Sequence, residues 1–203
     1  MQAYILRAKP HGIDQEKQFL DGRISIGWPC GISLDGKTRD EINTILSEKW
    51  NDITETSVSM VYLFVKMPRD SILLTPSNEN RSNIHIFVTT STYKYDKSAD
   101  TNEIGNPHFV EAKLLKTVPR DSLPNAVLRS LSGSRKTLSR ISQHYELLDD
   151  FISSKFETEL ESDVVTTSVE SRTEAMSVLF ELLSSESESI RLSAAIAILD
   201  HTE

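Results

Sequence analysis

The spacing of apolar and polar positions changes along the chain, and each pattern predicts a different kind of element. Short apolar runs between turn residues, and runs that alternate with a period of two, predict β-strands. These runs lie at residues 3–8, 23–27, 70–76, 83–91, 108–118 and 135–142. The polar turn between the third and the fourth run predicts an antiparallel hairpin.

Apolar positions spaced three or four residues apart predict helices between these strands. Glu41 follows Thr38 by three residues, which is the pattern of a capping box and predicts that a helix begins there. Residues 57–67 carry a second apolar face and predict a helix that packs against the sheet. Further along, Ser122 as the cap and Pro124 in the first turn predict a short helix.

The chain changes character near residue 154, where a last helical stretch closes a predicted α+β domain of residues 1–154. Residues 155–168 are polar and acidic, which predicts a linker. Residues 169–203 hold two amphipathic stretches and predict a helical hairpin of about one HEAT-type repeat. Because one repeat cannot bury its apolar face alone, we expect this hairpin to dock on its own domain, self-associate or bind a protein partner.

Composition narrows the class of protein. Hydrophobic residues make up 38% of the chain and charged residues 26%, as in ordinary globular proteins. No run approaches the roughly 20 apolar residues of a membrane-spanning helix, and the first residues lack the pattern of a secretory signal, so we expect a cytoplasmic protein with no membrane partner. Cys30 is the single cysteine, and the histidines show no ligand spacing, so we expect neither a metal nor a cofactor.

The charge is distributed unevenly. Residues 1–150 hold 19 Lys/Arg and 19 Asp/Glu, whereas residues 151–203 hold 3 and 11, so the whole excess of −8 lies in the second part. Between Ser122 and Tyr145 there are four basic residues and no acidic one. Such a segment suits contact with phosphates, although a solvated basic face would show the same pattern.

Four ordered motifs carry a resemblance to a known family. They are FLDGRISIGW, MVYLFVKMPRDSILLTP, NIHIFVTTSTYKYD and HFVEAKLLKTVPRDSLPNAVLRSLSGSRKTLSRI. Together they resemble the PUA-like reader domains, alongside EVE domains, at the front of Mrr-type and other modification-dependent restriction proteins. The similarity covers roughly residues 3–145. Arg69 and Asp70 stand where the family usually has Gly-Asp, so the chain departs from the family pattern at two glycines, which Arg69 and Phe87 replace.

The resemblance implies a PUA-like curved β-sheet, a partial barrel with flanking helices, that binds DNA and accepts one flipped base in a pocket. Related domains read 5-methylcytosine or other modified bases, and some bind RNA, so both nucleic acids stay open as partners. Extruding a base costs a few kcal/mol, which stacking on an aromatic ring and hydrogen bonds to the base offset. The expected setting is a restriction or phage-defence system, and the expected role is recognition without catalysis.

The candidate nucleic-acid-binding residues are aromatic residues that suit stacking on a base and polar or basic residues that suit contact with phosphate. They are Trp28, Tyr93, Arg120, Arg129, Ser134, Arg135, Lys136 and Arg140. For the two aromatic residues, packing in the core is the competing interpretation. Trp50, at the end of a capped helix, is typical of a core residue and is not among the candidates.

Two other functions compete with the reader. Glu111 and Lys113 form an E-x-K pattern on a predicted strand, with Asp96 and Asp100 upstream, as in nucleases that hold Mg²⁺. Short patterns of this kind arise often by chance. The other alternative is a protein-interaction module with a degenerate PUA-like fold that acts through its acidic C-terminal helices.

Overall fold

A computed structural model describes residues 1–154, 177–178, 180–185, 191–192 and 195. The chain divides into two units, Met1–Phe151 and Ile152–Glu203. The predicted linker at 155–168 and most of the predicted helical hairpin at 169–203 lie outside the described residues. Among the residues that are described, no helix is both long and apolar enough to cross a membrane.

The first unit is built on one seven-stranded sheet. Its strands are β1 (Ala3–Leu6), β2 (Arg23–Ile26), β3 (Ile72–Pro76), β4 (Asn83–Thr89), β5 (Lys94–Tyr95), β6 (His108–Pro119) and β7 (Leu138–Arg140). The order across the sheet is β2-β6-β4-β3-β1-β7, and β5 pairs with β6. All pairs are antiparallel except β1 with β3. The six longer strands fall where the sequence predicts strands.

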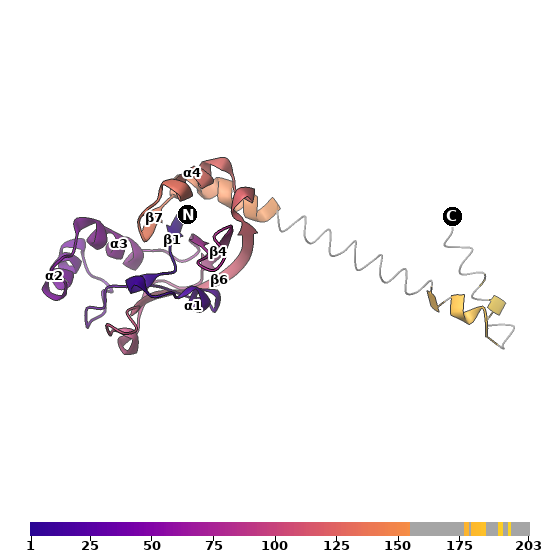
Figure 1. The fold of residues 1–203 in the computed structure, drawn as a ribbon, viewed down its shortest axis with the longest axis horizontal. Helices are drawn as coiled ribbons and strands as arrows, with labels where there is room; N and C mark the ends of the chain where they lie inside the picture. The colour runs from indigo at the N-terminus through magenta and orange to yellow at the C-terminus, as the bar shows by residue number, and fades with distance from the viewer. Residues whose placement is uncertain (155–176, 179, 186–190, 193–194, 196–203) are drawn as a thin grey trace. The chain divides into compact units, whose positions relative to one another are not determined.

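The long strand β6 joins two parts of the sheet and lets the sheet curl. Its first residues pair with β2 and β5, and its remaining residues pair with β4, with a bulge between Ile86 and Phe87. A bulge increases the local twist of a sheet. At the corner beside β2, Gly22 has φ +92°, and a Cβ there would lie 2.9 Å from the carbonyl oxygen of Ala112. The result is an α+β fold with a curled, half-barrel sheet, as Figure 1 shows.

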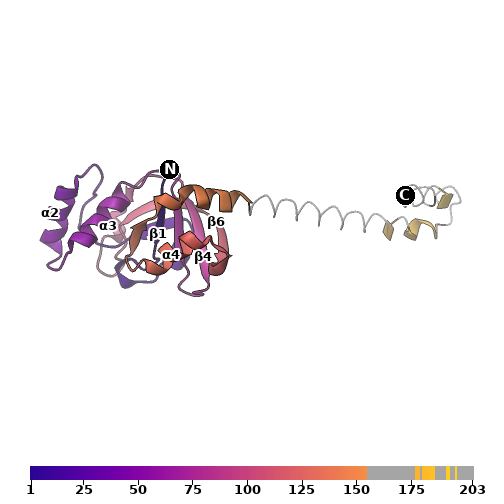
Figure 2. The ribbon, with the colours of Figure 1, turned by 90° about the horizontal axis from the view of Figure 1, so that it is seen from above.

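Four helices flank the sheet: α1 (Glu16–Leu20), α2 (Arg39–Lys49), α3 (Glu55–Val65) and α4 (Asn125–Gly133). A further helix begins at residue 145, and its described part runs to residue 154. The chain also forms 3₁₀ turns at Pro10–Gly12, Lys97–Ala99, Arg120–Ser122 and Ser142–His144. Helix α2 lies at one end of the unit beside α3 (Figures 1 and 2), and residues of α3 and α4 line one groove.

The capping signals had different outcomes. The capping box of Thr38 and Glu41 is confirmed, because each side chain bonds to the backbone N–H of the other residue. The prediction of Ser122 as a helix cap is wrong. The Ser122 hydroxyl donates to the carbonyl of Pro119 at 2.7 Å and closes a 3₁₀ turn, and Pro124 precedes α4 as its N-cap residue.

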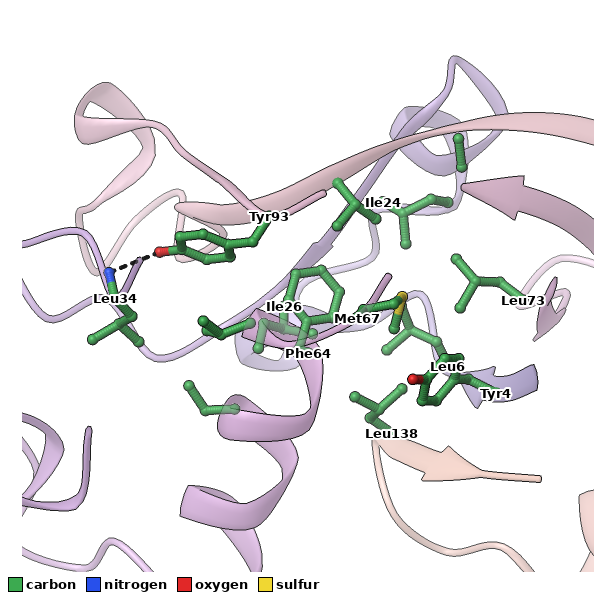
Figure 3. Packing of buried hydrophobic residues seen from close by; sticks show 14 of the residues in the cluster. Tyr4, Leu6, Ile24, Ile26, Leu34, Phe64, Met67, Leu73, Tyr93 and Leu138 are labelled. Atoms are coloured by element: carbon green, nitrogen blue, oxygen red, sulfur yellow. Dashed lines mark hydrogen bonds between the residues drawn. The ribbon is translucent and has the colours of Figure 1, made fainter. Parts of the chain in front are cut away.

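The main hydrophobic cluster lies on the face of the sheet against which α3 packs. Phe64 and Val61 of α3 are fully buried, together with Tyr4 of β1 and Ile24 of β2. Figure 3 shows Phe64 and Met67 between side chains of β1, β2 and β7. The predicted packing of residues 57–67 against the sheet is therefore confirmed.

Candidate nucleic-acid interface

A cavity of about 330 Å³ opens between the segment after β1, the segment after β2 and the start of α3. We call it the aromatic cavity, because its lining includes His11, Trp28 and Trp50, together with Lys9, Asp52 and Ile53. The ring centroids of His11 and Trp50 are 5.5 Å apart in an edge-to-face arrangement. The volume lies at the lower end of the range of about 300–1,000 Å³ that is usual for small-molecule sites.

Strained backbone lines the aromatic cavity. Among the residues that the structure describes, three non-glycine residues have positive φ, and two of them, His11 at 52° and Trp28 at 68°, line it. Such conformations cost about 1–3 kcal/mol each and are concentrated at functional sites. Two glycines leave the room that His11 needs. A Cβ on Gly27 would lie 2.8 Å from the backbone nitrogen of His11, and a Cβ on Gly105 would lie 2.7 Å from the side chain of His11.

A chain of buried hydrogen bonds holds the backbone at Trp28. The amide of Leu34 donates to the Tyr93 hydroxyl at 3.0 Å, and that hydroxyl lies 2.8 Å from Nδ1 of His108. On the other side of the ring, Nε2 of His108 lies 3.2 Å from the carbonyl oxygen of Trp28. The second tryptophan is held independently, since Nε1 of Trp50 donates to the carbonyl of Pro29 at 3.2 Å.

These buried groups are neutral near pH 7. Burial lowers the pKa of His108 to about 4. Burial also raises the pKa of Tyr93 to about 12. The Sγ atom of Cys30 lies 3.8 Å from Nε2 of His108, but burial raises the pKa of the thiol as well. A neutral imidazole beside a protonated thiol serves to position the backbone and does not activate a nucleophile.

A second cavity, of about 380 Å³, adjoins the first. We call it the cationic cavity. Its charged lining residues are Arg7, Lys9, Arg81 and Arg120, and no carboxylate lines it. They come from distant parts of the chain: two follow β1, one lies in the turn between β3 and β4, and one follows β6.

Two of the four cations are tethered. Nη2 of Arg7 donates to the carbonyl of Ser134 at 2.8 Å, and Nη2 of Arg120 donates to the hydroxyl of Ser132 at 3.2 Å. No ion pair involves Lys9 or Arg81 within the described residues.

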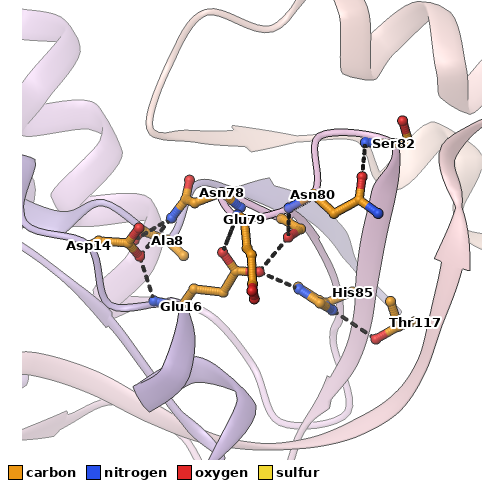
Figure 4. Close-up of polar contacts among 10 residues, drawn as sticks. Ala8, Asp14, Glu16, Asn78, Glu79, Asn80, Ser82, His85 and Thr117 are labelled. Atoms are coloured by element: carbon orange, nitrogen blue, oxygen red, sulfur yellow. Dashed lines mark hydrogen bonds and ion pairs between the residues drawn. The ribbon is translucent and has the colours of Figure 1, made fainter.

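Glu16 fixes the turn that forms one wall of the cationic cavity. Its carboxylate accepts hydrogen bonds from the Ser77 hydroxyl at 2.5 Å and from the amides of Asn78 and Glu79 at 2.6 and 3.1 Å. It also lies 2.8 Å from Nε2 of His85 (Figure 4). Burial alone would raise the pKa of Glu16, but these hydrogen bonds outweigh it and hold the pKa below its usual value. The turn is therefore anchored to the start of α1.

Lys9 lines both cavities and is the point where they meet. An aromatic recess and a group of cations thus lie on either side of one lysine side chain. This pairing suits a ligand that combines a flat ring with a phosphate, because aromatic faces stack on bases and cations bind phosphate oxygens.

The structure distributes the predicted site residues over several places. Trp28 lines the aromatic cavity and Arg120 lines the cationic cavity. Arg129 is exposed on α4, beside a shallow cavity of about 480 Å³. The remaining basic segment lines a groove of about 630 Å³ against α3, with contributions from Ser134, Arg135, Lys136 and Arg140. From this segment only Thr137 lines the aromatic cavity, so the predicted basic rim beside Trp28 is supplied by Lys9 instead.

The prediction that Tyr93 stacks on a base is wrong. Its side chain is 8% exposed, and its ring stacks on His108 with a centroid separation of 5.8 Å. Tyr95 also makes a structural contact, because its hydroxyl donates to Asp100 at 2.6 Å. Both tyrosines lie around the two-residue strand β5, where the sequence predicts only a loop.

Several lining residues escape prediction from the sequence. Arg7, Lys9 and Arg81 stand apart from the basic segment, and each is a single cation in an otherwise ordinary stretch. His11 lies in the loop after β1, where no neighbouring motif in the sequence marks it as a site residue. Trp50 follows a capped helix and looks like a core residue. A possible signal was the excess of turn formers around them, KPHGI and GWPCG, which is typical of loops that form a site.

The described residues bring no nuclease centre together. Glu111 is exposed and pairs with Lys94, with Oε1 and Nζ 2.7 Å apart. Asp96 pairs with Arg23 at 3.2 Å, and Asp100 accepts hydrogen bonds from Gly31 and Tyr95. In the part of the chain that the structure describes, no three His, Cys, Asp or Glu residues are grouped to hold a metal ion.

The crystal structure of protein Atu2648 from Agrobacterium tumefaciens is similar to this chain, with 10% sequence identity and a TM-score of 0.37. The match covers 76% of this chain and 92% of that protein. No protein-family model and no curated protein matches the chain. A similarity this distant carries no argument about function.

Proposed function

We propose that this chain binds nucleic acid, with an unstacked base in the aromatic cavity and the neighbouring phosphate in the cationic cavity. The observation that carries the proposal is the position of Lys9, which lines both cavities. A nucleotide has the same arrangement, since its base and its phosphate lie on either side of one sugar.

Energetics support this use of the two cavities. Stacking a base on an aromatic side chain contributes about 1–3 kcal/mol, which offsets the few kcal/mol needed to extrude a base from a duplex. Asp52, exposed at the edge of the aromatic cavity, offers a carboxylate that can accept hydrogen bonds from base N–H groups. The cations of the other cavity supply sequence-independent attraction to phosphate.

The finer part of the proposal is that the base is a modified base in DNA, read in a restriction or phage-defence setting by a PUA-like domain. It rests on the four ordered motifs and on the curled half-barrel sheet, which agrees with the architecture that the resemblance implies. In this reading the chain recognises its target and leaves catalysis to a partner.

Fluorescence polarisation tests the proposal with methylated duplex, unmodified duplex and single-stranded oligonucleotides, each at two salt concentrations. We expect binding that weakens as salt rises and that is strongest for the methylated duplex. Lys9→Ala should weaken binding more than Lys17→Ala, an equal charge change on the exposed face of α1 outside the described cavities. If none of the oligonucleotides shows salt-dependent binding, the proposal is wrong.

A second candidate function is a protein-interaction module. In the described part of the second unit, large apolar side chains are exposed, among them Val178 at 50%, Phe180 at 56% and Leu192 at 63%. Light scattering on the full chain tests self-association. A larger mass that Phe180→Asp and Leu192→Asp reduce would favour this function, and a monomer at all concentrations would count against self-association.

A further inference from the structure

We propose that the cationic cavity binds the terminal phosphate of a nucleic-acid strand, so that the base in the aromatic cavity belongs to the terminal nucleotide. This inference rests on the proposed function and names the part of the nucleic acid that is bound. It goes beyond contact with the phosphodiester backbone, because a terminal phosphate is a monoester with its own charge and shape.

The shape of the cavity favours an end of a strand. Four separate segments surround its volume of about 380 Å³: the residues after β1, the β3–β4 turn, the residues after β6, and α4. It is more enclosed than the 630 Å³ groove beside α3. A continuous backbone must enter and leave every site that it crosses, which an open groove allows. A recess with walls from four segments more readily admits a group that stands at the end of a chain.

The charge of the cavity favours a dianion. Arg7, Lys9, Arg81 and Arg120 line it without a carboxylate, and none of them forms an ion pair with a described residue. A backbone diester carries one negative charge, whereas a phosphate monoester carries about −1.5 to −2 at pH 7. Four unneutralised cations around one recess match the monoester better.

Two carboxylates near the cavity form no ion pair with its cations. Glu16 lies behind the wall of the cavity, where it accepts hydrogen bonds from Ser77 and Asn78. Asp121 lines the neighbouring shallow cavity that shares Arg81 and Arg120, but it forms an ion pair with neither. The cations therefore keep their charge for a ligand.

The available hydrogen-bond donors also suit a phosphate. The neutral side chains of the wall are occupied, because the Ser77 hydroxyl donates to Glu16 and Nδ2 of Asn78 donates to Asp14 at 2.9 Å. The tethered guanidinium groups of Arg7 and Arg120 each keep further N–H donors. Charge-assisted bonds from guanidinium groups to phosphate oxygens are among the strongest that proteins form.

The free-energy cost of placing a base in the aromatic cavity is also lowest for a terminal nucleotide. The cost of extruding a base from a duplex is lowest where the base is unpaired or already single-stranded, and a base at an end has a stacking neighbour on one side only. The two cavities, joined at Lys9, would then hold base and phosphate of the same terminal nucleotide.

The test uses the full chain and labelled oligonucleotides of one sequence that end in a 5′-phosphate, in a 3′-phosphate, or in hydroxyls at both ends. We expect a phosphorylated end to bind about tenfold tighter or more than the hydroxyl ends, the size of one charge-assisted hydrogen bond. Inorganic phosphate should compete with the preferred phosphorylated oligonucleotide and should hardly affect the binding of the oligonucleotide with hydroxyls at both ends.

Variants show where the preference arises. Arg81→Ala should abolish the preference for a phosphorylated end, and Arg81→Lys should keep part of it. Arg69→Ala makes the same charge change outside the described cavities and should leave the preference intact. Circular dichroism confirms that each variant is folded.

Two outcomes overturn the inference in different ways. Equal salt-dependent binding of all ends, or of a circular single strand without ends, would show that the cavity does not select a terminal phosphate and would leave the proposed function standing. Absence of binding to every oligonucleotide would overturn both.

Discussion

Tyr93 and His108 form a buried pair that decides which ring nitrogen of the histidine carries the proton. The Tyr93 hydroxyl accepts from the amide of Leu34, so its own proton points to Nδ1 of His108, 2.8 Å away. Nε2 therefore carries the ring proton and donates it to the carbonyl of Trp28 at 3.2 Å. Through this pair the core sets the strained backbone that presents Trp28 to the aromatic cavity.

Removal of the Tyr93 hydroxyl should destabilise the protein measurably. In Tyr93→Phe, Nδ1 of His108 loses its donor and the amide of Leu34 loses its acceptor, both in a buried setting. We expect the free energy of unfolding to fall by about 1–3 kcal/mol, measured by urea denaturation. Tyr62→Phe is the control, because no hydrogen bond involves its hydroxyl within the described residues, and it should change stability little. Equal effects in the two variants would contradict the role of the pair.

His108 should also make stability depend on pH. Its pKa is about 4 in the folded protein against 6.5 in the unfolded chain, so the unfolded chain binds the proton first as the pH falls. Stability should therefore be constant above about pH 7 and should fall below 6.5, with a loss that approaches about 3 kcal/mol near pH 4. Denaturation at a series of pH values measures this loss.

The contribution of His108 can be separated from that of the acids. Glu16, whose hydrogen bonds hold its pKa below the usual value, contributes stability that is lost only at lower pH than that of His108. In His108→Asn the decline between pH 6.5 and 4.5 should become shallower, although the variant starts from a lower stability. An unchanged slope in this range would mean that His108 is not the group that titrates.

Glu16 should contribute to the stability of the folded protein. Glu16→Gln removes the carboxylate charge and replaces one of the two oxygens that bond to His85 and hold the turn at Ser77. We expect a loss of about 2–4 kcal/mol in the free energy of unfolding, because the remaining partners are buried. Glu79→Gln, at an exposed position on the same turn, should change stability by less than about 0.5 kcal/mol. If Glu16→Gln left the free energy of unfolding unchanged, the anchoring role of this network would be contradicted.

Much of the fold follows from local sequence signals. Short apolar runs and period-two runs mark the six longer strands, and the Thr38 and Glu41 pair marks the start of α2, because these patterns depend on neighbours a few residues away. The prediction that Ser122 caps a helix fails because its hydroxyl bonds to a local carbonyl in a turn as readily as it caps a helix. Strand β5 is too short to show a period.

The site was harder to predict because it is assembled across the chain. Arg7 and Arg81 meet only because β1 pairs with β3 in parallel and β3 turns back into β4, and no local pattern encodes that pairing. The charge pattern drew attention to the basic segment beside α4 instead. The burial of Tyr93 is not encoded locally for a related reason: it depends on His108 and Leu34, which are distant in sequence.

Trp28 should contribute to binding through its aromatic face. Trp28→Ala should weaken oligonucleotide binding by about 1–3 kcal/mol, the usual contribution of one stacked base, and Trp28→Phe should restore most of it. Polarisation titrations at fixed salt measure the effect. Since the salt dependence reflects phosphate contacts, its slope should stay unchanged in both variants. If Trp28→Ala changed the slope of the salt dependence and left the affinity unchanged, the stacking role of Trp28 would be contradicted.

The most direct test uses the protein's own fluorescence. Both of its tryptophans, Trp28 and Trp50, line the aromatic cavity, so a base that stacks there must alter their emission. Titration with an oligonucleotide should quench tryptophan fluorescence with the same dissociation constant that polarisation reports, and the remaining signal in Trp50→Phe should still be quenched. Binding that leaves the emission unchanged would show that the base does not enter this cavity and would contradict the account.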